Sequence, residues 1–293
     1  MSPCEHRFTQ LDVFTDRALL GNPLAVVHGA DGLSGEQMAA FARWTNLSET
    51  TFLLAPTEVG ADYRVRIFTP TVELPFAGHP TLGSCHAWLA AGGQPRMAGE
   101  VVQQCGVGLV RIRRDGTRLA FAVPPRRRSG PLDEATVERI ARFLQIPRTA
   151  VVAHQHCDNG PGWQAVMLAS ADAVLALRPL LGSEGDLEVG VIGPAAIGKV
   201  GVVGAHGAGV QPAFEVRAFF PAPGGSLAED PVTGSLNAAL AQWLIGDGLA
   251  PPHYVAAQGA ALGRAGRVHV AQQGDDIWIG GDCVAVVQGT VAL

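Results

Sequence analysis

Residues 65–84 read VRIFTPTVELPFAGHPTLGS, and residues 216–235 read VRAFFPAPGGSLAEDPVTGS. The two stretches lie 151 residues apart, and eight of their twenty aligned positions are identical without a gap. Identities in the same order at a fixed spacing indicate an internal repeat. The sequence therefore predicts two related halves, each containing one copy of the same local structure.

The local structure of each copy can be predicted from its pattern. An alternating apolar strand, 63–68 or 214–219, ends at a proline and is followed by a loop of about eight residues. A polar residue, a proline and an apolar helix come next. The polar residue, His79 or Asp230, is predicted at or next to the helix N-cap. Because both helices are apolar on all sides, each is expected to be buried inside its own half.

Other segments of the chain indicate short strands and surface helices around this repeat. Helices are expected at 35–45, with a capping box between Ser34 and Gln37, at 133–144, capped by Asp133, and near 170–180. Strands are expected at 7–14, 24–28, 51–55, 107–113, 118–123, 150–154, 163–168, 199–204, 267–272, 276–280 and 284–288.

These elements predict an α+β fold of two pseudo-symmetric barrel-like domains. Each domain is expected to be a mostly antiparallel sheet wrapped around a central helix. The first domain is assigned to 1–126 and the second to 127–283, and the last strand, about 284–293, can return to the first domain. The proline and arginine residues at 124–130 form the natural linker.

Composition excludes several classes of function. The 293 residues carry a net charge of -5 with scattered basic residues, so nucleic-acid binding is not expected. The five cysteines are odd in number and none forms a CxxC pair, which favours a reducing cytoplasm over a disulfide framework. Neither a leader peptide nor an apolar run of about twenty residues is evident, so no membrane association is expected.

The starts of the two repeat helices are the first candidates for a binding site. A helix N-terminus attracts anions through its free N–H groups, so two facing helix starts would suit a small carboxylate. Glycines at 78, 83 and 234 leave backbone amides accessible, and Ser84 and Ser235 are expected in the first turns. The alternative is that both serines only satisfy the helix ends.

Titratable residues in or near the repeat suggest acid/base chemistry. His79 and Asp230 occupy equivalent positions in the two copies but differ in type, as suits groups that hold different protonation states. N-capping by Asp230 and a surface position for His79 is the plainer alternative. Glu49 lies between a predicted helix and a predicted strand, where a single glutamate is usually solvated.

The chain resembles the phenazine-biosynthesis PhzF-like family over almost its whole length. The resemblance rests on several motifs that occur in order, and no one of them would be specific alone. They are DVFT at 12–15, GNPLAV at 21–26, NLSET at 46–50, FAGHPTLG at 76–83 and EDPVTGS at 229–235.

This resemblance implies a fold like diaminopimelate epimerase, with a site between two barrels, and a homodimer. It also implies isomerisation of trans-2,3-dihydro-3-hydroxyanthranilate without metal or organic cofactor. Glu49 then inherits the role of moving a proton on the substrate ring, assisted by His79 and Asp230. Substrate binding falls to Ser235 and to the amides of Gly78 and Gly234, and Ser84 is a further candidate.

Other readings of the same fold stay open. An amino-acid epimerase or racemase would need a thiol pair at the two helix starts, but 77–79 and 229–231 contain no cysteine and Cys85 lies one turn further on. A catalytically silent small-molecule binder is also compatible with the motifs. No metal is expected, and the best candidate for one is the cluster of His154, His156 and Cys157, which lacks an evident further ligand.

Overall fold

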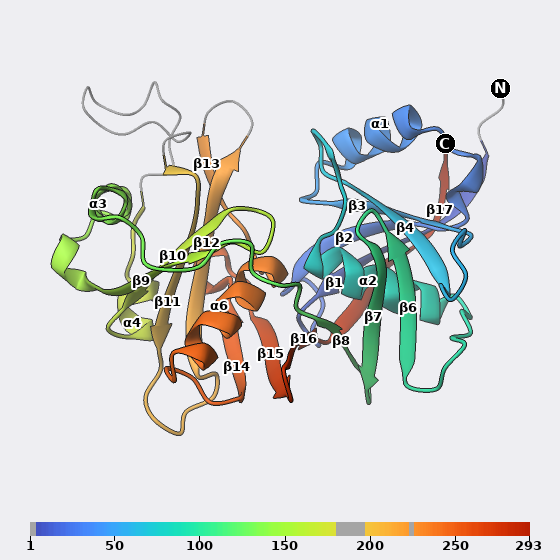
Figure 1. The fold of residues 1–293 in the computed structure, drawn as a ribbon. Coiled ribbons are helices and arrows are strands. Elements are labelled where there is room, and N and C mark those ends of the chain that lie inside the picture. The colour runs from blue at the N-terminus through green and yellow to red at the C-terminus, as the bar shows by residue number, and fades with distance from the viewer. Residues whose placement is uncertain (1–3, 180–196, 223–225) are drawn as a thin grey trace. The chain divides into compact units, whose positions relative to one another are not determined.

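The computed structural model describes residues 4–179, 197–222 and 226–293 (Figure 1). The chain divides into two compact units. The first contains Met1–Ala122 and Trp278–Leu293, and the second contains Val123–Ile277. The sequence had placed this division a few residues further along the chain, at 126/127. The C-terminal segment pairs with the first strand of the N-terminal unit, so the end of the chain returns to that unit.

The N-terminal unit is a sheet that surrounds helix α2 (Gly78–Ala90). Strand β1 pairs with both β17 and β2 in antiparallel fashion, and the pairs β2–β3 and β4–β6 are parallel. Helix α2 contacts six strands, namely β1, β2, β3, β6, β8 and β17, and therefore fills the inside of the sheet (Figure 1). The strands are β1 (Glu5–Val13), β2 (Asn22–Val27), β3 (Thr50–Leu54), β4 (Tyr63–Phe68), β5 (Glu73–Leu74), β6 (Glu100–Cys105), β7 (Gly108–Asp115), β8 (Arg118–Ala122), β16 (Asp276–Gly281) and β17 (Cys283–Ala292).

The C-terminal unit repeats this plan around helix α6 (Gly234–Gly246), which contacts β9 and β15. The pairs β10–β11 and β12–β14 are parallel, and the pairs β9–β10, β11–β12, β12–β13 and β14–β15 are antiparallel. Its strands are β9 (Val151–Cys157), β10 (Trp163–Leu168), β11 (Lys199–Ala205), β12 (Phe214–Ala222), β13 (Ser226–Glu229), β14 (His253–Gln258) and β15 (Gly266–Gln273).

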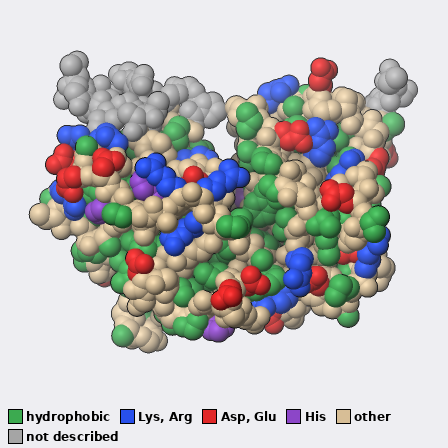
Figure 2. Space-filling model, in the orientation of Figure 1, with side chains coloured by type: hydrophobic (Ala, Val, Ile, Leu, Met, Phe, Trp, Pro, Cys, Tyr) green, Lys and Arg blue, Asp and Glu red, His purple; other side chains and the backbone are tan. Residues whose placement is uncertain are grey.

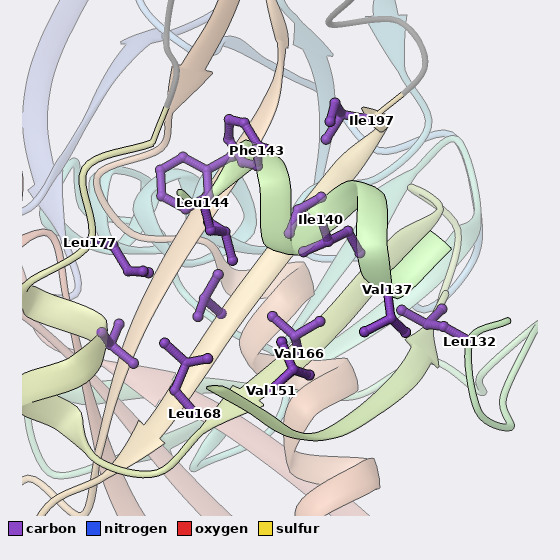
Figure 3. Close-up of a cluster of buried hydrophobic side chains, with 14 of the residues drawn as sticks. Leu132, Val137, Ile140, Phe143, Leu144, Val151, Val166, Leu168, Leu177 and Ile197 are labelled. Atoms are coloured by element: carbon purple, nitrogen blue, oxygen red, sulfur yellow. The ribbon is translucent and has the colours of Figure 1, made fainter. Parts of the chain in front are cut away.

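Surface helices add a second hydrophobic layer to each unit. Helix α1 (Gly35–Thr45) packs against β3 and β4, and α3 (Glu134–Phe143) and α4 (Ala171–Leu175) pack on the strands of the C-terminal unit. Figure 3 shows Val137 and Ile140 of α3 near Val166 of β10, in a buried cluster that also contains Phe143 and Leu168. The short 3-10 turns are η1 (Ala30–Gly32), η2 (Arg148–Ala150) and η4 (Ala260–Leu262).

The α+β class and the helices expected at 35–45 and 133–144 agree with the sequence. The helix expected near 170–180 is shorter, Ala171–Leu175, and residue 180 lies outside the described residues. The capping box of Ser34 and Gln37 is present, and the Asp133 side chain accepts from the Thr136 N–H at the start of α3. Among the described strands, β5, β6, β13 and β14 were not indicated by the sequence. Of these, β6 and β14 contain buried glutamines at 103, 104 and 258. Because these amides bond to specific partners inside the protein, a strand that is polar in sequence can be buried.

The starts of the two repeat helices differ from the prediction. Helix α2 has Ala77 as its N-cap, so His79 lies inside the first turn, and α6 has Thr233 as its N-cap, three residues beyond Asp230. The N-cap prediction was therefore wrong for both residues. By the 151-residue spacing Gly78 corresponds to Glu229, so the first helix starts more than a turn earlier than the second.

The surface side chains of the two units do not form a patch of one charge on the face that Figure 2 shows. On the face drawn in Figure 2, basic and acidic side chains occur on each unit among hydrophobic and neutral ones. No helix within the described ranges is both long enough and apolar enough to span a membrane.

Candidate active site

The position of Glu49 follows from the way α1 ends. Asn46 adopts a left-handed conformation (φ 52°), and its N–H bonds to Ala42 O at 3.2 Å. Asparagine tolerates this conformation better than most residues, so it can terminate a helix and turn the chain. Strand β3 begins four residues later at Thr50. Glu49 therefore stands at the entrance to β3, with its side chain only 16% exposed.

His79 lies next to Glu49. Its Nε2 atom is 3.4 Å from Glu49 Oε2, and the imidazole is 6% exposed. Burial lowers the pKa of His79 to about 3, because the charged ring would lose its hydration. The ring is therefore neutral near pH 7, and the contact joins a carboxyl group to a neutral imidazole and is not an ion pair.

Asn22 lies on the other side of the same ring. It begins β2, is fully buried, and its Nδ2 is 3.4 Å from His79 Nδ1. With the amide oriented in this way, Nδ1 accepts and the ring proton is assigned to Nε2. This nitrogen lies near Glu49 Oε2 but makes no hydrogen bond to it in the structure. The sequence did not single out Asn22 as a site residue. Its sequence signal was its place in the GNPLAV motif at 21–26. The structure adds that a Cβ at Gly21 would lie 2.4 Å from Val13 O, so that only glycine fits before this asparagine.

The first turn of α2 supplies free backbone donors beside His79. The first hydrogen bond within the helix runs from Thr81 N to Ala77 O at 3.1 Å. The N–H groups of Gly78 and His79 precede it and have no acceptor one turn earlier, which is the usual condition for an anion site.

Ser84 and Gly83 of α2, two candidates for substrate contact, make packing contacts inside the N-terminal unit. Ser84 lies in the second turn, not the first, is fully buried, and donates to Thr51 Oγ1 at 2.9 Å. A Cβ at Gly83 would lie 2.5 Å from Leu24 Cδ2, so Gly83 allows α2 to approach β2 closely. The first-turn placement of Ser84 was wrong because the helix begins earlier than the repeat pattern suggested.

The C-terminal unit holds Ser235 in the first turn of α6. The indole N–H of Trp163 donates to Ser235 Oγ at 3.0 Å, and the Asn159 amide donates to Ser235 O at 2.9 Å. Because its oxygen already accepts a hydrogen bond, the hydroxyl proton of Ser235 is available to donate to a ligand. Gly234 is buried beside it at the first helical position.

Asp230 belongs to a network of side chains before α6. Thr233 Oγ1 donates to Asp230 Oδ2 at 2.6 Å, and Gln258 Nε2 donates to Asp230 O at 3.1 Å. Gln258 Oε1 in turn accepts from Asn237 Nδ2 at 2.9 Å. Gln258 and Asn237 are 1% and 2% exposed. Sequence reasoning missed both, because polar residues within apolar elements give no signal of their partners.

The cysteine and histidine residues considered for thiol-based epimerase chemistry or for metal binding have structural surroundings. Burial raises the pKa of the Cys85 thiol to about 12, so this cysteine is a protonated core residue. His154 Nδ1 accepts from Leu132 N at 3.0 Å, and Cys157 is fully buried. Across the described ranges, no group of three His, Cys, Asp or Glu side chains is arranged to hold a metal ion.

The predicted site residues thus fall into two sets. Glu49, His79 and Gly78 lie together in the N-terminal unit, and Asp230, Gly234 and Ser235 lie together in the C-terminal unit. Each set contains a helix start with free N–H groups and at least one titratable side chain.

Known proteins resemble this chain over most of its length. Residues 11–289 match the family described as phenazine biosynthesis-like protein, PhzC-PhzF. A trans-2,3-dihydro-3-hydroxyanthranilate isomerase of Pseudomonas aeruginosa is 34% identical over 279 residues, covering 92% of this chain and 91% of that protein. The antisense-enhancing sequence 1 protein of Schizosaccharomyces pombe is 38% identical over 241 residues, covering 79% and 77%. The crystal structure of a Bacillus anthracis PhzF-family protein has the same fold, with a TM-score of 0.79 at 21% identity over 99% of this chain and 100% of that one. The chain therefore belongs to the phenazine biosynthesis-like PhzC-PhzF family.

Proposed function

We propose that this PhzF-type isomerase moves a proton between carbon atoms of a small cyclic carboxylate, with Glu49 as the group that carries the proton. The substrate class follows that of the relative from Pseudomonas aeruginosa, whose name specifies trans-2,3-dihydro-3-hydroxyanthranilate. The observation that supports the proposal most directly is the contact of 3.4 Å between Glu49 Oε2 and the neutral ring of His79.

Glu49 is suited to take a proton and return it. In the forward step a carboxylate oxygen removes a proton from one ring carbon, and the electron pair moves into the conjugated system of the substrate. The resulting carboxylic acid then delivers the same proton to another carbon, which restores the carboxylate. A positioned acid/base group of this kind typically contributes about 10²–10⁴ in rate.

His79 assists as a neutral donor. With its proton on Nε2, the imidazole can donate to the Glu49 carboxylate without carrying charge into the site. An imidazolium at this distance would hold the carboxylate in its ionised form and oppose proton uptake. The neutral ring therefore keeps Glu49 able to alternate between its two protonation states.

Asp230 and the two helix starts complete the proposal. The N–H group of Gly78 in the N-terminal unit, and the N–H group of Gly234 and hydroxyl of Ser235 in the C-terminal unit, are each suited to bind an anionic group. Asp230, oriented by Thr233, is assigned to positioning and to assistance in protonation. Ser84, through its bond to Thr51, supports β3 next to Glu49. No metal or organic cofactor is required in this scheme.

The test is turnover followed by proton NMR in D₂O with trans-2,3-dihydro-3-hydroxyanthranilate. Wild type is expected to convert the ring-proton pattern of the substrate, and Glu49→Gln is expected to lower kcat by at least about 10². Glu36→Gln is the matched control, because Glu36 is exposed on α1. Conversion by Glu49→Gln at the wild-type rate would refute the role of Glu49, and no conversion by wild type would refute this substrate.

The homodimer, the cytoplasmic location and the absence of nucleic-acid binding stay predictions from the sequence. Sedimentation of the purified protein would test the first of these.

A further inference from the structure

Strand β4 changes its pairing partner midway along one edge. It pairs with β6 at Tyr63 and Arg64, and then with β5 at Ile67 and Phe68. Between these pairings, no described strand is paired with Val65 and Arg66 on that edge. A cavity of about 440 Å³ opens at this break, lined by residues 64–66, 73–75 and 104–106 of the N-terminal unit.

The cavity contains one arginine that is neutralised and one that is not. Arg66 forms a bidentate pair with Glu73, with both N–O distances at 2.7 Å. Arg64 has no ion pair within the described part of the chain, and its buried Nε atom has no hydrogen-bond partner there. A guanidinium stays charged at all ordinary pH values, so the cavity carries surplus positive charge in a chain whose net charge is -5.

The second half of the molecule shows the same break, and there each charged side chain at the equivalent position lies within 4 Å of an ionisable partner, with Glu215 Oε1 making no hydrogen bond within the described residues. Strand β12 likewise pairs first with β14 and then with β13. By the 151-residue spacing, Glu215 and Arg217 occupy the positions of Arg64 and Arg66. Arg217 is paired with Glu229 at 2.7 Å, and Glu215 Oε2 lies 3.5 Å from His206 Nε2. The repeated architecture therefore does not require an unpaired cation at this position.

The remaining lining suits a small organic molecule. Val65, Leu74 and Pro75 supply apolar surface, and burial raises the pKa of the Cys105 thiol, so that it adds no negative charge. Arginine binds planar carboxylates and phosphates through two parallel N–H donors.

We propose that this cavity is a second binding site, in which Arg64 holds the carboxylate or phosphate group of a small organic anion and the apolar wall contacts its body. The site is separate from Glu49 and does not depend on the proposed function. Its wall at Leu74 and Pro75 belongs to the segment that leads into α2.

The experiment is a titration of the full-length ¹⁵N-labelled protein with benzoate and, separately, with inorganic phosphate, followed by NMR without substrate. We expect the Arg64 Nε–H signal and the amides of Leu74 and Gly106 to shift together and to saturate. The probe that saturates at the lower concentration identifies the group that the site prefers. If neither probe shifts these signals, the proposal is wrong.

Variants at Arg64 provide the second arm. Arg64→Gln is expected to weaken binding at least about tenfold, because a charge-assisted hydrogen bond is lost. Arg43→Gln, which alters an exposed arginine of α1, is the matched control and is expected to bind as wild type does. Unchanged binding in Arg64→Gln would overturn the proposal. If Arg64→Gln does not fold, the titration of wild type tests the second binding site by itself, through the shift of the Arg64 Nε–H signal.

Discussion

Both halves of the molecule place an arginine over a phenylalanine two residues further along the same strand. The distance from the guanidinium carbon to the ring centre is 5.0 Å for Arg66 and Phe68, and 5.1 Å for Arg217 and Phe219. Each arginine also forms a bidentate pair with a glutamate. The side chains of Arg66 and Glu73 are 32% and 42% exposed, whereas those of Arg217 and Glu229 are 5% and 2% exposed.

The difference shows that one repeated motif can serve two purposes. In the C-terminal unit the arginine is enclosed. It donates to Leu177 O, just after α4, at 2.9 Å and to Val174 O of α4 at 3.4 Å, so it ties the end of α4 to the sheet. In the N-terminal unit the equivalent arginine stays half-exposed beside an open cavity. The repeat therefore preserves the strand and its arginine–glutamate pair, while the covering segments decide whether that pair is enclosed or borders an open cavity.

The starts of the repeat helices differ in a parallel way. At α2 a carboxyl group meets a neutral imidazole in mostly buried surroundings. At α6 the carboxylate of Asp230 accepts from Thr233 within a network of amide and hydroxyl groups. The first arrangement is suited to proton transfer, and the second is suited to hold groups in place.

The largest expected effect is on the free energy of unfolding, when the Arg217–Glu229 pair and the Arg66–Glu73 pair are broken in separate variants. Glu229→Gln leaves Arg217 as a buried charge without its carboxylate, so we expect the free energy of unfolding to fall by about 3–5 kcal/mol. Glu73→Gln removes an exposed partner and is expected to cost about 0–1 kcal/mol. Urea unfolding of both variants measures the comparison. Equal losses would show that enclosure does not distinguish the two halves.

The pH dependence of stability is the next expected effect. Unfolded His79 binds a proton below about pH 6.5, whereas the folded ring, with its pKa lowered to about 3, does not. The unfolded state therefore holds more protons between these values, and the free energy of unfolding falls as the pH falls through this window. His79 is expected to contribute up to about 1.4 kcal/mol per pH unit.

The control for this slope is His79→Gln, which removes the titrating group. Burial and the charge of Arg7 also lower the pKa of His28, to about 4, so part of the slope is expected to persist in the variant. Urea unfolding between pH 7 and 4 measures both proteins. An identical slope in wild type and variant would mean that His79 titrates normally in the folded state.

The smallest expected effect tests the hydroxyl of Ser235. Trp163→Phe keeps most of the buried ring but removes the N–H that bonds to Ser235 Oγ. One neutral hydrogen bond contributes about 1 kcal/mol, so KM is expected to rise about fivefold while kcat changes little. Steady-state kinetics on the substrate tests this. A fall in kcat with unchanged KM would instead place Ser235 in the chemical step.

The sequence predicts the parts of the fold that depend on local pattern. The helices at 35–45 and 133–144 are confirmed because their caps, Ser34 and Asp133, act within one turn of chain. Strands β6 and β14 were missed because their buried glutamines are satisfied by residues distant in sequence, as in the bond from Tyr63 to Gln103 at 2.8 Å. Pattern reasoning has no access to such partners.

The candidate site was predictable only in part, because its contacts also join residues that are distant in sequence. Glu49 and His79 are thirty residues apart in sequence, and only the fold brings them within 3.4 Å. The neutrality of His79 depends on its burial, and the assignment of its proton depends on Asn22, which lies on a different strand. The repeat drew attention to His79 and the resemblance to the PhzF-like family drew attention to Glu49, but the protonation of the proposed pair required the three-dimensional arrangement.

The most direct test of this account is ¹⁵N NMR of the His79 imidazole, assigned by comparison with His79→Gln. We predict that at pH 5–8 one ring nitrogen keeps the signal of a protonated nitrogen and the other that of an unprotonated one, with the proton on Nε2. Two protonated ring nitrogens near pH 6 would show an imidazolium beside Glu49 and would contradict the proposed role of a neutral donor.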